Sequence, residues 1–506
     1  MNEHLRLAER EVALRPNYQA SAAGAECNSA LLPSRLLRRR GLRRACTLAF
    51  LALVSPSFAA DPPPKAPVPP SPWLPGIYRY ADAMLQHGRD TCGPQKTGLF
   101  LSALDRTTLA PLTIRPPAPA GVREEDRAGP KDGPLTGANL QHDENLLRLL
   151  YTLSELSSKP VYRDAADGAL KWFFQNAPSP LPWGTNLSWN VTTDEVTAKP
   201  KDAKPEFFRP WLLWDRCFEV AAEPTKQFAL GLKSPAAVGM DHPRDAGFSI
   251  RTWAVAYAQT KDPQFLKAIE VALERFERKR HSKTGLIVSS TGSTDAWPAS
   301  SLSLAIDCDG AAHRVPEPLA SHLRAFAARE DEVFCALSHD LKTKGGFVSV
   351  INPDGGNTKV EFTPRWDTRY GANTSAQVAL LCVSRYENTG GIAHRNLMLA
   401  AAEAYLNSSP PDDADTWPLA YGHAISLQVS AWRHTARPVH LEDARRLAAI
   451  AVEKFWGTST LPRASLKSEH YESITGADTL ALALVELHLN ILAITAVRSP
   501  ANTIDR

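Results

Sequence analysis

A repeated pair of helical segments is the feature that most restricts how this chain of 506 residues can fold. In each pair an apolar segment is followed, within a few residues, by an amphipathic segment with apolar side chains at i, i+3, i+4 and i+7. The first segment is apolar nearly all round, which predicts a buried inner helix. The second has a charged face, as in Lys267, Glu270 and Glu274, which predicts an outer helix. The pairs are residues 146–151 with 162–174, 253–257 with 265–276, 302–307 with 319–337, 378–386 with 394–405, and 427–432 with 441–456.

The two ends of the chain supply one more pair. A helix predicted near residues 77–87 and the apolar segment 477–497 can lie together as a closing pair. The total is then about six helical hairpins. The sequence therefore predicts an all-α fold, an (α/α)-hairpin toroid or barrel in which hairpins stack side by side.

The connectors differ in length in a regular way. Links from an inner to an outer helix are short, whereas links from an outer to the next inner helix are long, so all long loops must emerge at one end. Long loops on a rigid scaffold are where function concentrates. We therefore expect the functional face to be built from residues 175–248, 284–302, 344–377, 407–424 and 457–479.

The N-terminal region has the pattern of an export signal. Residues 1–59 carry nine Arg and four Glu, include a short apolar segment at 47–54, and end on Ser57-Phe58-Ala59, which suits a cleavage site. We interpret them as a signal peptide with a long n-region, followed by a Pro-rich linker (60–75), one domain (76–499) and a tail (500–506). This organisation predicts a periplasmic or secreted protein with no membrane span after signal removal.

Net charge and cysteine content restrict the kinds of partner and metal site that the protein can have. The net charge of +3 falls to −2 when the +5 of residues 1–59 is removed, which argues against nucleic acid as a partner. Five Cys remain after the leader, widely spaced and without a C-x-x-C pair. They predict mostly buried free thiols, at most one or two disulfides, and no thiolate zinc site.

The predicted functional face is rich in aromatic and basic side chains. Seven of the twelve Trp fall in the long connectors. Aromatic faces stack on sugar rings, and Arg pairs with carboxylates, although Trp also commonly plugs a loop onto a helix. The aromatic and basic residues are Trp183, Trp189, Arg209, Trp211, Trp214, His242, Arg244, Trp297, Arg365, Trp366, Tyr370, Trp417, Tyr421, His423, Arg463, His470 and Tyr471.

The densest group of acid–base side chains is His470-Tyr471-Glu472, just before the last apolar segment. No capping or packing pattern accounts for these three residues, so they are candidates for contact with a ligand. Thr475 to Asp478 has the S/T-x-x-D spacing of a helix cap, which makes Asp478 a capping residue rather than a catalytic one. Asp143 begins the first inner helix on its apolar face; it would point inward, or simply favour the helix dipole.

Two further stretches carry candidate residues. Residues 207–219 read as a helix with Pro210 in its first turn, which aligns Trp211, Asp215 and Glu219 along one face beside Trp214. The alternative for this stretch is an Arg216–Glu219 ion pair within the helix. His242 and Arg244 place a base beside a cation just before the second inner helix.

The hairpin array with its aromatic, charged loops resembles the six-hairpin (α/α) toroid superfamily of glycosidases and polysaccharide lyases. The likeness covers roughly residues 139–497 and is architectural. The stretches 88–94, 181–184 and 470–475 also look like those of secreted bacterial proteins described as pectate-lyase-like. The resemblance implies a carbohydrate-active enzyme with a poly- or oligosaccharide substrate.

Three functions remain open from the sequence. The first is β-elimination on a uronate-containing glycan, with His470 or His242 as base, Tyr471 or Tyr370 as acid and a carboxylate clamp chosen from Arg209, Arg244, Arg365 and Arg463. No cofactor is expected; calcium is possible for a lyase, although no D-x-D-x-D-G loop is present. The second is glycoside hydrolysis by two carboxylates drawn from Asp143, Asp215, Glu219 and Glu472. The third is a glycan-binding envelope protein without chemistry.

Overall fold

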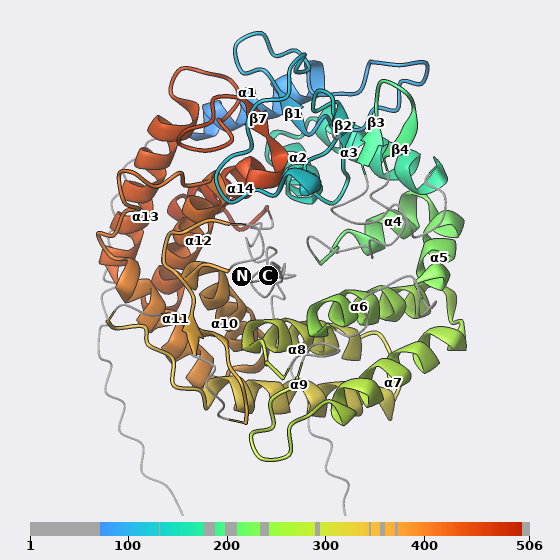
Figure 1. Cartoon of the computed structure of the whole chain (residues 1–506), viewed down its shortest axis with the longest axis vertical. Helices are drawn as coiled ribbons and strands as arrows, with labels where there is room; N and C mark the ends of the chain where they lie inside the picture. Colours follow the sequence, from blue (N-terminus) through green and yellow to red (C-terminus); the bar gives the residue numbers. More distant parts are fainter. Residues whose placement is uncertain are drawn as a thin grey trace, which may run out of the picture. The chain divides into compact units, whose positions relative to one another are not determined.

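The predicted hairpins are present and follow one another around a ring (Figure 1). The computed structural model describes residues 71–130, 132–176, 188–197, 210–232, 242–288, 294–343, 346–354, 360–369 and 373–497. All of them fall in one compact unit. The hairpins, inner helix first, are α2 (Glu144–Ser157) with α3 (Pro160–Asn176), α6 (Pro243–Thr260) with α7 (Pro263–Arg278), α8 (Pro298–Ala312) with α9 (Leu319–Cys335), α10 (Ser375–Thr389) with α11 (Ile392–Tyr405), and α12 (Pro418–Thr435) with α13 (Pro438–Ala451).

The first and last helices complete the ring. The last inner helix, α14 (Ala477–Ile491), packs against both α12 and α2, and α1 (Leu74–Gln86) packs on α14 and α3. The Trp73 indole N–H donates to the carbonyl of Leu484 at 3.0 Å, which fixes α1 on α14. The predicted all-α toroid of about six hairpins is therefore confirmed, and the chain closes between its first and last inner helices.

One helical pair lies inside a segment predicted to be a connector. Two short helices, α4 (Trp214–Val220) and α5 (Ala222–Gly231), pack between α3 and α6. The helix expected to begin at Pro210 begins instead at Trp214, so Trp211 lies in the preceding loop and does not share a helix face with Asp215. At the other boundary, α1 begins at Leu74, inside the predicted linker, because Pro75 is tolerated in the first turn of a helix.

The short hairpin turns share one backbone device. Four inner helices end on a residue in the left-handed conformation, with φ of 57° at Ser158, 58° at Lys261, 73° at Gly390 and 54° at Ala436. The outer helix starts two residues later, with Pro in its first turn in three of the four cases. The left-handed residue ends one helix and the fixed φ of Pro starts the next, which explains why these turns are so short.

The long connectors meet at the other end of the ring and pair through short strands. β1 (Ala103–Leu104) pairs with β7 (Tyr471–Glu472), and β2 (Gly137–Ala138) with β3 (Ser188–Asn190), which also pairs with β4 (Glu195–Thr197). β5 (Val348–Val350) pairs with β6 (Glu361–Phe362), and Ala296 bridges the neighbouring connector to Ile351. The predicted end of long loops is therefore present.

The five cysteines beyond residue 59 are free thiols: Cys92, Cys217, Cys308, Cys335 and Cys382. Within the described ranges, no helix is both long enough and apolar enough to cross a bilayer. The predicted signal peptide (1–59) and tail (500–506) lie outside the described residues.

Candidate functional site

The N-terminal ends of the inner helices carry buried polar side chains, although the helices are otherwise apolar. All these ends face the long connectors, because every inner helix follows a long connector and runs in the same direction. Helix N-termini also carry partial positive charge, which favours carboxylates. We call the buried polar residues in or just before the first two turns of the inner helices the mouth: His142, Asp143, Glu144, Asn145, Arg148, Arg244, Asp245, Ser249, Ser300, Ser301, Ser303, Thr374, Ser375, Gln377, Thr416, His423, Thr475, Asp478 and Thr479.

Three carboxylates of the mouth come from the helices that close the ring: Asp143, Asp478 and Glu144, which accepts the N–H of Leu212 at 2.6 Å. Asp143 occupies the N-cap position of α2 but makes no capping hydrogen bond to that helix. The carboxylate of Asp478, on α14, accepts the N–H of Leu146 in the first turn of α2 at 3.1 Å. Asp478 therefore caps the neighbouring helix, which leaves Asp143 without a capping role.

The sequence had assigned Asp478 as a cap of its own helix through Thr475. That arrangement does not form: Gly476 is the N-cap residue of α14, and the Thr475 hydroxyl donates to the carbonyl of Glu472 at 2.9 Å. A cap supplied by another helix has no local sequence pattern, because its donor and acceptor are 332 residues apart.

Three neighbouring inner helices bring their polar residues together. The side-chain amide of Asn145 donates to the Thr479 hydroxyl at 2.8 Å, and Arg148 donates to the side-chain oxygen Oδ1 of Asn145 at 2.8 Å. On the other side of α14, a Cβ at Gly422 would lie 3.0 Å from the Thr479 carbonyl oxygen, so α12 approaches α14 closely there. His423 follows Gly422, so the predicted binding residue His423 and the predicted catalytic residue Asp143 lie on two helices that flank α14.

Two tyrosines contact each other where the first helix meets the C-terminal connector. The hydroxyls of Tyr80, on α1, and Tyr471, on β7, are 3.2 Å apart, and both residues are almost fully buried. The pKa of Tyr80 is raised well above its usual value, mainly by burial and then by Tyr471, Asp478 and Asp143. Tyr80 therefore lies within electrostatic range of Tyr471, Asp478 and Asp143.

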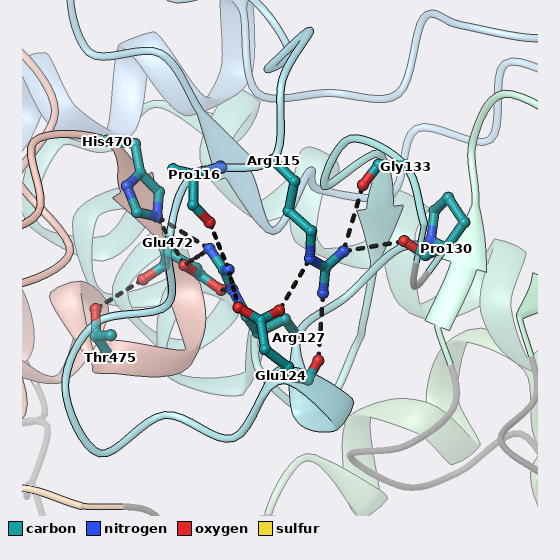
Figure 2. Close-up of polar contacts among 9 residues, drawn as sticks. All are labelled: Arg115, Pro116, Glu124, Arg127, Pro130, Gly133, His470, Glu472 and Thr475. Carbon is teal, nitrogen blue, oxygen red and sulfur yellow. Dashed lines mark hydrogen bonds and ion pairs between the residues drawn. The ribbon is translucent and has the colours of Figure 1, made fainter.

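The predicted group His470-Tyr471-Glu472 is divided by strand geometry. Side chains alternate between the two faces of a strand, so Tyr471 points to one side of β7 and its two neighbours point to the other. Figure 2 shows the second side: Arg127 donates to both carboxylate oxygens of Glu472, at 2.8 and 2.9 Å, and His470 Nε2 lies 2.7 Å from one of them. Tyr471 therefore points toward Tyr80, away from the side of β7 that carries the Arg127–Glu472 pair.

Glu472 is a permanently charged group in this arrangement. Burial raises the pKa of its carboxyl, but hydrogen bonds from His470 and Arg127, together with the charge of Arg127, lower it from 4.5 to about 2. A carboxylate that stays ionised at every physiological pH cannot donate a proton to a leaving group. The contacts assign Glu472 to an internal ion pair that joins the N-terminal loop to the C-terminal connector.

The same ion pair continues into a wider network. Arg127 also donates to the carbonyl of Pro116 and to Glu124, and Arg115 binds Glu124 and the carbonyls of Pro130 and Gly133 (Figure 2). Nearby, Arg106 donates to the carbonyls of Leu461, Phe455 and Trp456 and to Glu469, which also pairs with Arg463. We call the network around Arg127, Arg106, Glu469 and Glu472 the seam, since it ties the start of the domain to its end. The predicted clamp residue Arg463 belongs to the seam.

Four tryptophans that were predicted to stack on sugars instead anchor loops to the helices. The Trp211 indole donates to the sulfur of Cys217 at 3.3 Å, Trp366 to the Ser408 hydroxyl at 2.8 Å, and Trp417 to the carbonyl of Ala120 at 2.9 Å. Trp214 packs among aromatic rings of α3, α5 and α6. All four are buried, so none presents a ring face to a sugar. The prediction is corrected because each indole is covered by its own helices and loops.

Two predicted carboxylates lie at the wrong end of the ring. Asp215 pairs with Arg314 through both oxygens, at 3.0 and 2.6 Å, and Arg314 follows the C-terminal end of α8, opposite the mouth. Glu219 is exposed and pairs with Arg216, which is the alternative that the sequence left open. Neither residue can reach the carboxylates of the mouth.

The remaining predicted residues divide into three groups. His242 is the N-cap residue of α6, and Arg244, in its first turn, pairs with Asp245 at 3.3 Å, so both belong at the mouth end. Arg365 is half-buried on the connector before α10. Arg209 and Tyr370 lie outside the described residues, as do residues 233–241, which lead into α6.

No metal centre is evident in the part of the chain that the structure describes, since no three His, Cys, Asp or Glu side chains there gather as ligands. The expectation that no cofactor is needed stays a prediction.

Several residues of this region have no motif that marks them in the sequence. Asp478 was set aside as a cap, and Tyr80 and Asp245 were not considered. One signal was present: charged or amide side chains at the start of segments that are otherwise apolar, as at Glu144-Asn145 and Asp478-Thr479. Burying such side chains costs free energy unless they form hydrogen bonds or ion pairs. Their recurrence at equivalent helix starts therefore indicates a shared polar region.

No protein-family model matches the chain, and no curated protein matches it. Solved structures with a similar arrangement include an inactive variant of the α-1,6-mannanase of Salegentibacter sp. HEL1_6 in complex with α-1,6-mannotetrose (10% identity, TM-score 0.44, 83% of this chain and 99% of that chain). They also include a cellobiose 2-epimerase from Bacillus thermoamylovorans (9%, 0.45, 81% and 98%) and an unsaturated glucuronyl hydrolase specific for heparin (16%, 0.37, 56% and 85%). The fold itself rests on the helix contacts: it is the six-hairpin (α/α) toroid.

Proposed function

We propose that this protein is a glycoside hydrolase that cleaves a poly- or oligosaccharide at the mouth, with Asp143 and Asp478 as its two carboxylates. One observation carries the proposal: two buried carboxylates, Asp143 and Asp478, stand at the N-terminal ends of adjacent inner helices. Glycoside hydrolysis requires two carboxyl groups that flank the scissile bond.

The surroundings of the pair suit a sugar. Amide, hydroxyl, guanidinium and imidazole groups of Asn145, Thr479, Arg148 and His423 come from the same three helices, and sugar hydroxyls both donate to and accept from such groups. One carboxyl group would protonate the leaving oxygen, while the other would act as base or nucleophile. The nearby Tyr471 hydroxyl would hydrogen-bond the carboxyl group that stays ionised.

The test is cleavage of a glycan panel by the mature protein, with new reducing ends as the readout. The panel holds neutral mannan and cello-oligosaccharides beside pectate, alginate and ulvan. Asp143→Asn and Asp478→Asn should each lower turnover on the order of 10²–10⁴-fold, because an amide cannot transfer the proton. Asp215→Asn, at the opposite end of the ring, is the matched control and should keep wild-type turnover. Full activity of both mouth variants, with unchanged folding, would rule out the carboxylate pair.

A second candidate, β-elimination on an acidic glycan, is favoured by one specific observation. His242 and Arg244 adjoin at the start of α6, and Asp245 holds the Arg244 guanidinium. These residues would supply the base and the carboxylate clamp of a lyase. Absorbance of unsaturated uronate during the same incubation, lost in His242→Ala, would select the lyase. Binding of a glycan without any product would select the non-catalytic protein.

The basic residues, apolar segment and small-residue end of residues 1–59 suit an export signal, so we also propose export through these residues. N-terminal sequencing of the protein recovered from the periplasm or medium should begin at Ala60. Turnover should survive EDTA; a loss restored by calcium would instead support the calcium-dependent form of the lyase.

A further inference from the structure

We propose that Tyr80 is a positioning residue of this site: its hydroxyl donates to the hydroxyl of Tyr471 and so directs the Tyr471 proton toward Asp143 and Asp478. The inference rests on the proposed function, since it gives the tyrosine pair a role in that reaction. Tyr80 acts through Tyr471 and does not itself touch the substrate.

The position of Tyr80 is fixed by packing on two sides. Its ring lies 6.0 Å from that of Tyr471 and meets Trp456 edge-on at 6.3 Å. The helix that carries it is held on α14 by the Trp73–Leu484 hydrogen bond. A side chain held in this way has little rotational freedom, so its hydroxyl keeps one direction toward Tyr471.

The direction of the hydrogen bond follows from counting donors and acceptors. The Tyr80 residue is 0% exposed, and among the described residues its hydroxyl has one hydrogen-bond partner, Tyr471. If Tyr471 were the donor, the Tyr80 proton would have no acceptor in a fully buried position, which costs the free energy of an unmade hydrogen bond. Tyr80 therefore donates, and the proton of Tyr471 remains available to another acceptor.

We place that acceptor among the carboxylates of the mouth, because the Tyr471 hydroxyl is 3.2 Å from the hydroxyl of Tyr80, which the charges of Asp143 and Asp478 influence. Asp478 and Asp143 both contribute to the raised pKa of Tyr80, so the two phenols and the two carboxyl groups lie within electrostatic range. A phenol that donates to one carboxylate stabilises its charge and leaves the other carboxyl group to hold the proton. This asymmetry is what a hydrolase needs, because one carboxyl group must be an acid while the other is a base.

The first experiment is a kinetic cycle with Tyr80→Phe, Tyr471→Phe and the double variant. Tyr80→Phe keeps the ring and removes the proton donor; kcat should fall roughly 10-fold with KM unchanged, and the pH profile of kcat should shift, since one hydrogen bond is lost. The double variant should be no slower than Tyr471→Phe alone, because Tyr80 acts only through Tyr471. An unchanged pH profile in Tyr80→Phe, or a further loss in the double variant, would overturn the inference.

A matched control separates positioning from stability. Tyr162 is buried on α3, and its hydroxyl donates to Asp82 at 2.7 Å, away from the mouth. Tyr162→Phe therefore removes a comparable hydrogen bond and should lower Tm by a similar amount, while kcat and its pH profile stay as in wild type. An equal shift of the pH profile in Tyr162→Phe would contradict a specific role for Tyr80.

The second experiment needs no substrate. In protein labelled with ¹³Cζ-tyrosine, the Tyr471 resonance, identified by its loss in Tyr471→Phe, should move with pH as the carboxylate pair titrates. Tyr80→Phe should change this pH dependence of the Tyr471 resonance, whereas Tyr162→Phe should not. If wild type cleaved no glycan, the proposed function would fail, but this titration would still decide whether Tyr80 orients Tyr471. The same course in wild type and Tyr80→Phe would overturn the inference.

Discussion

Glu472 shows how one residue can look catalytic in the sequence and be structural in the fold. Its carboxylate is 2% exposed, receives two hydrogen bonds from Arg127 and one contact from His470, and keeps its charge. Breaking a buried pair by removing one partner leaves an uncompensated charge, which is strongly destabilising. At this scale the seam is a set of obligatory partners rather than a reaction centre.

The first prediction concerns the stability of the Arg127–Glu472 ion pair at acidic pH. Because the folded-state pKa of Glu472 is lowered from 4.5 to about 2, its contribution to stability is complete above pH 4.5 and is lost as pH falls toward 2. Glu472→Gln should be less stable than wild type by about 3 kcal/mol at neutral pH, and the difference should shrink below pH 4. Urea unfolding from pH 3 to 7 measures it. A difference that does not vary with pH would contradict the assigned pair.

The second prediction concerns Glu486, whose pKa is shifted upward, in the opposite direction to that of Glu472. Burial raises the pKa of this carboxyl on α14 from 4.5 to about 7, against the lowering effects of Arg433, Ser426 and Arg148. The unfolded chain then loses its proton before the folded one does, so stability falls as pH rises from 4.5 to 7. Glu486→Gln should remove this dependence and gain stability relative to wild type across that range, by up to about 3 kcal/mol.

Wild type and variant must be compared at each pH, because Glu330 has a similarly raised pKa of about 7 and adds to the background slope. Glu330→Gln provides the matched variant in the α8–α9 hairpin. A constant offset between Glu486→Gln and wild type from pH 4.5 to 7 would show that the Glu486 carboxyl is ionised throughout.

At the scale of elements, the repeated hairpin turn is decided by backbone conformation more than by side chains. Gly390 and Ala436 occupy the same position in two hairpins, with φ of 73° and 54°, but only Gly390 adopts it without a Cβ penalty. A Cβ added at Gly390 would meet no atom within 4 Å, so its substitution tests backbone conformation alone. The left-handed residue in each break therefore ends one helix and allows the next to start.

The third prediction uses this matched pair. Gly390→Ala should lower the free energy of unfolding by roughly 1 kcal/mol, since an L-residue is strained in the left-handed region. Ala436→Gly should raise it by a similar amount for the same reason. Thermal or urea unfolding measures both. Effects of the same sign in the two variants would mean that contacts, not φ, determine these turns.

At the scale of the whole molecule, ring closure depends on the ends of the sequence. α2 and α14 are joined by Asp478–Leu146, Asn145–Thr479 and the β1–β7 strand pair, and the seam holds the loop before α2 on the connector before α14. The carboxylates of the proposed site stand on these two helices. The site therefore exists only when the ring is closed.

The fourth prediction is that α2 and α14 exchange their amide hydrogens as one unit. Arg127→Ala should accelerate exchange in both helices together, because it opens the seam, and should leave α8 and α9 on the far side of the ring unchanged. Hydrogen–deuterium exchange with mass spectrometry resolves these peptides. Acceleration confined to residues 105–136 would show that the seam holds only its own loop.

The sequence by itself determined the helices, their pairing and the end of the ring where long loops gather. These properties are local, since hydrophobic periodicity, Pro and left-handed turns act within a few residues. The six pairs predicted from such patterns are all present. The pair that was not predicted, α4 and α5, is short enough for its pattern to be lost between aromatic residues.

Only the tertiary structure decided which polar residues meet. His470, Tyr471 and Glu472 are adjacent in sequence, yet strand alternation separates Tyr471 from the other two. Asp143 and Asp478 are 335 positions apart by residue number, yet ring closure places them on adjacent helices. The physical reason is that a capping bond or an ion pair between distant segments depends on where the ring closes, and no periodicity along the chain records that.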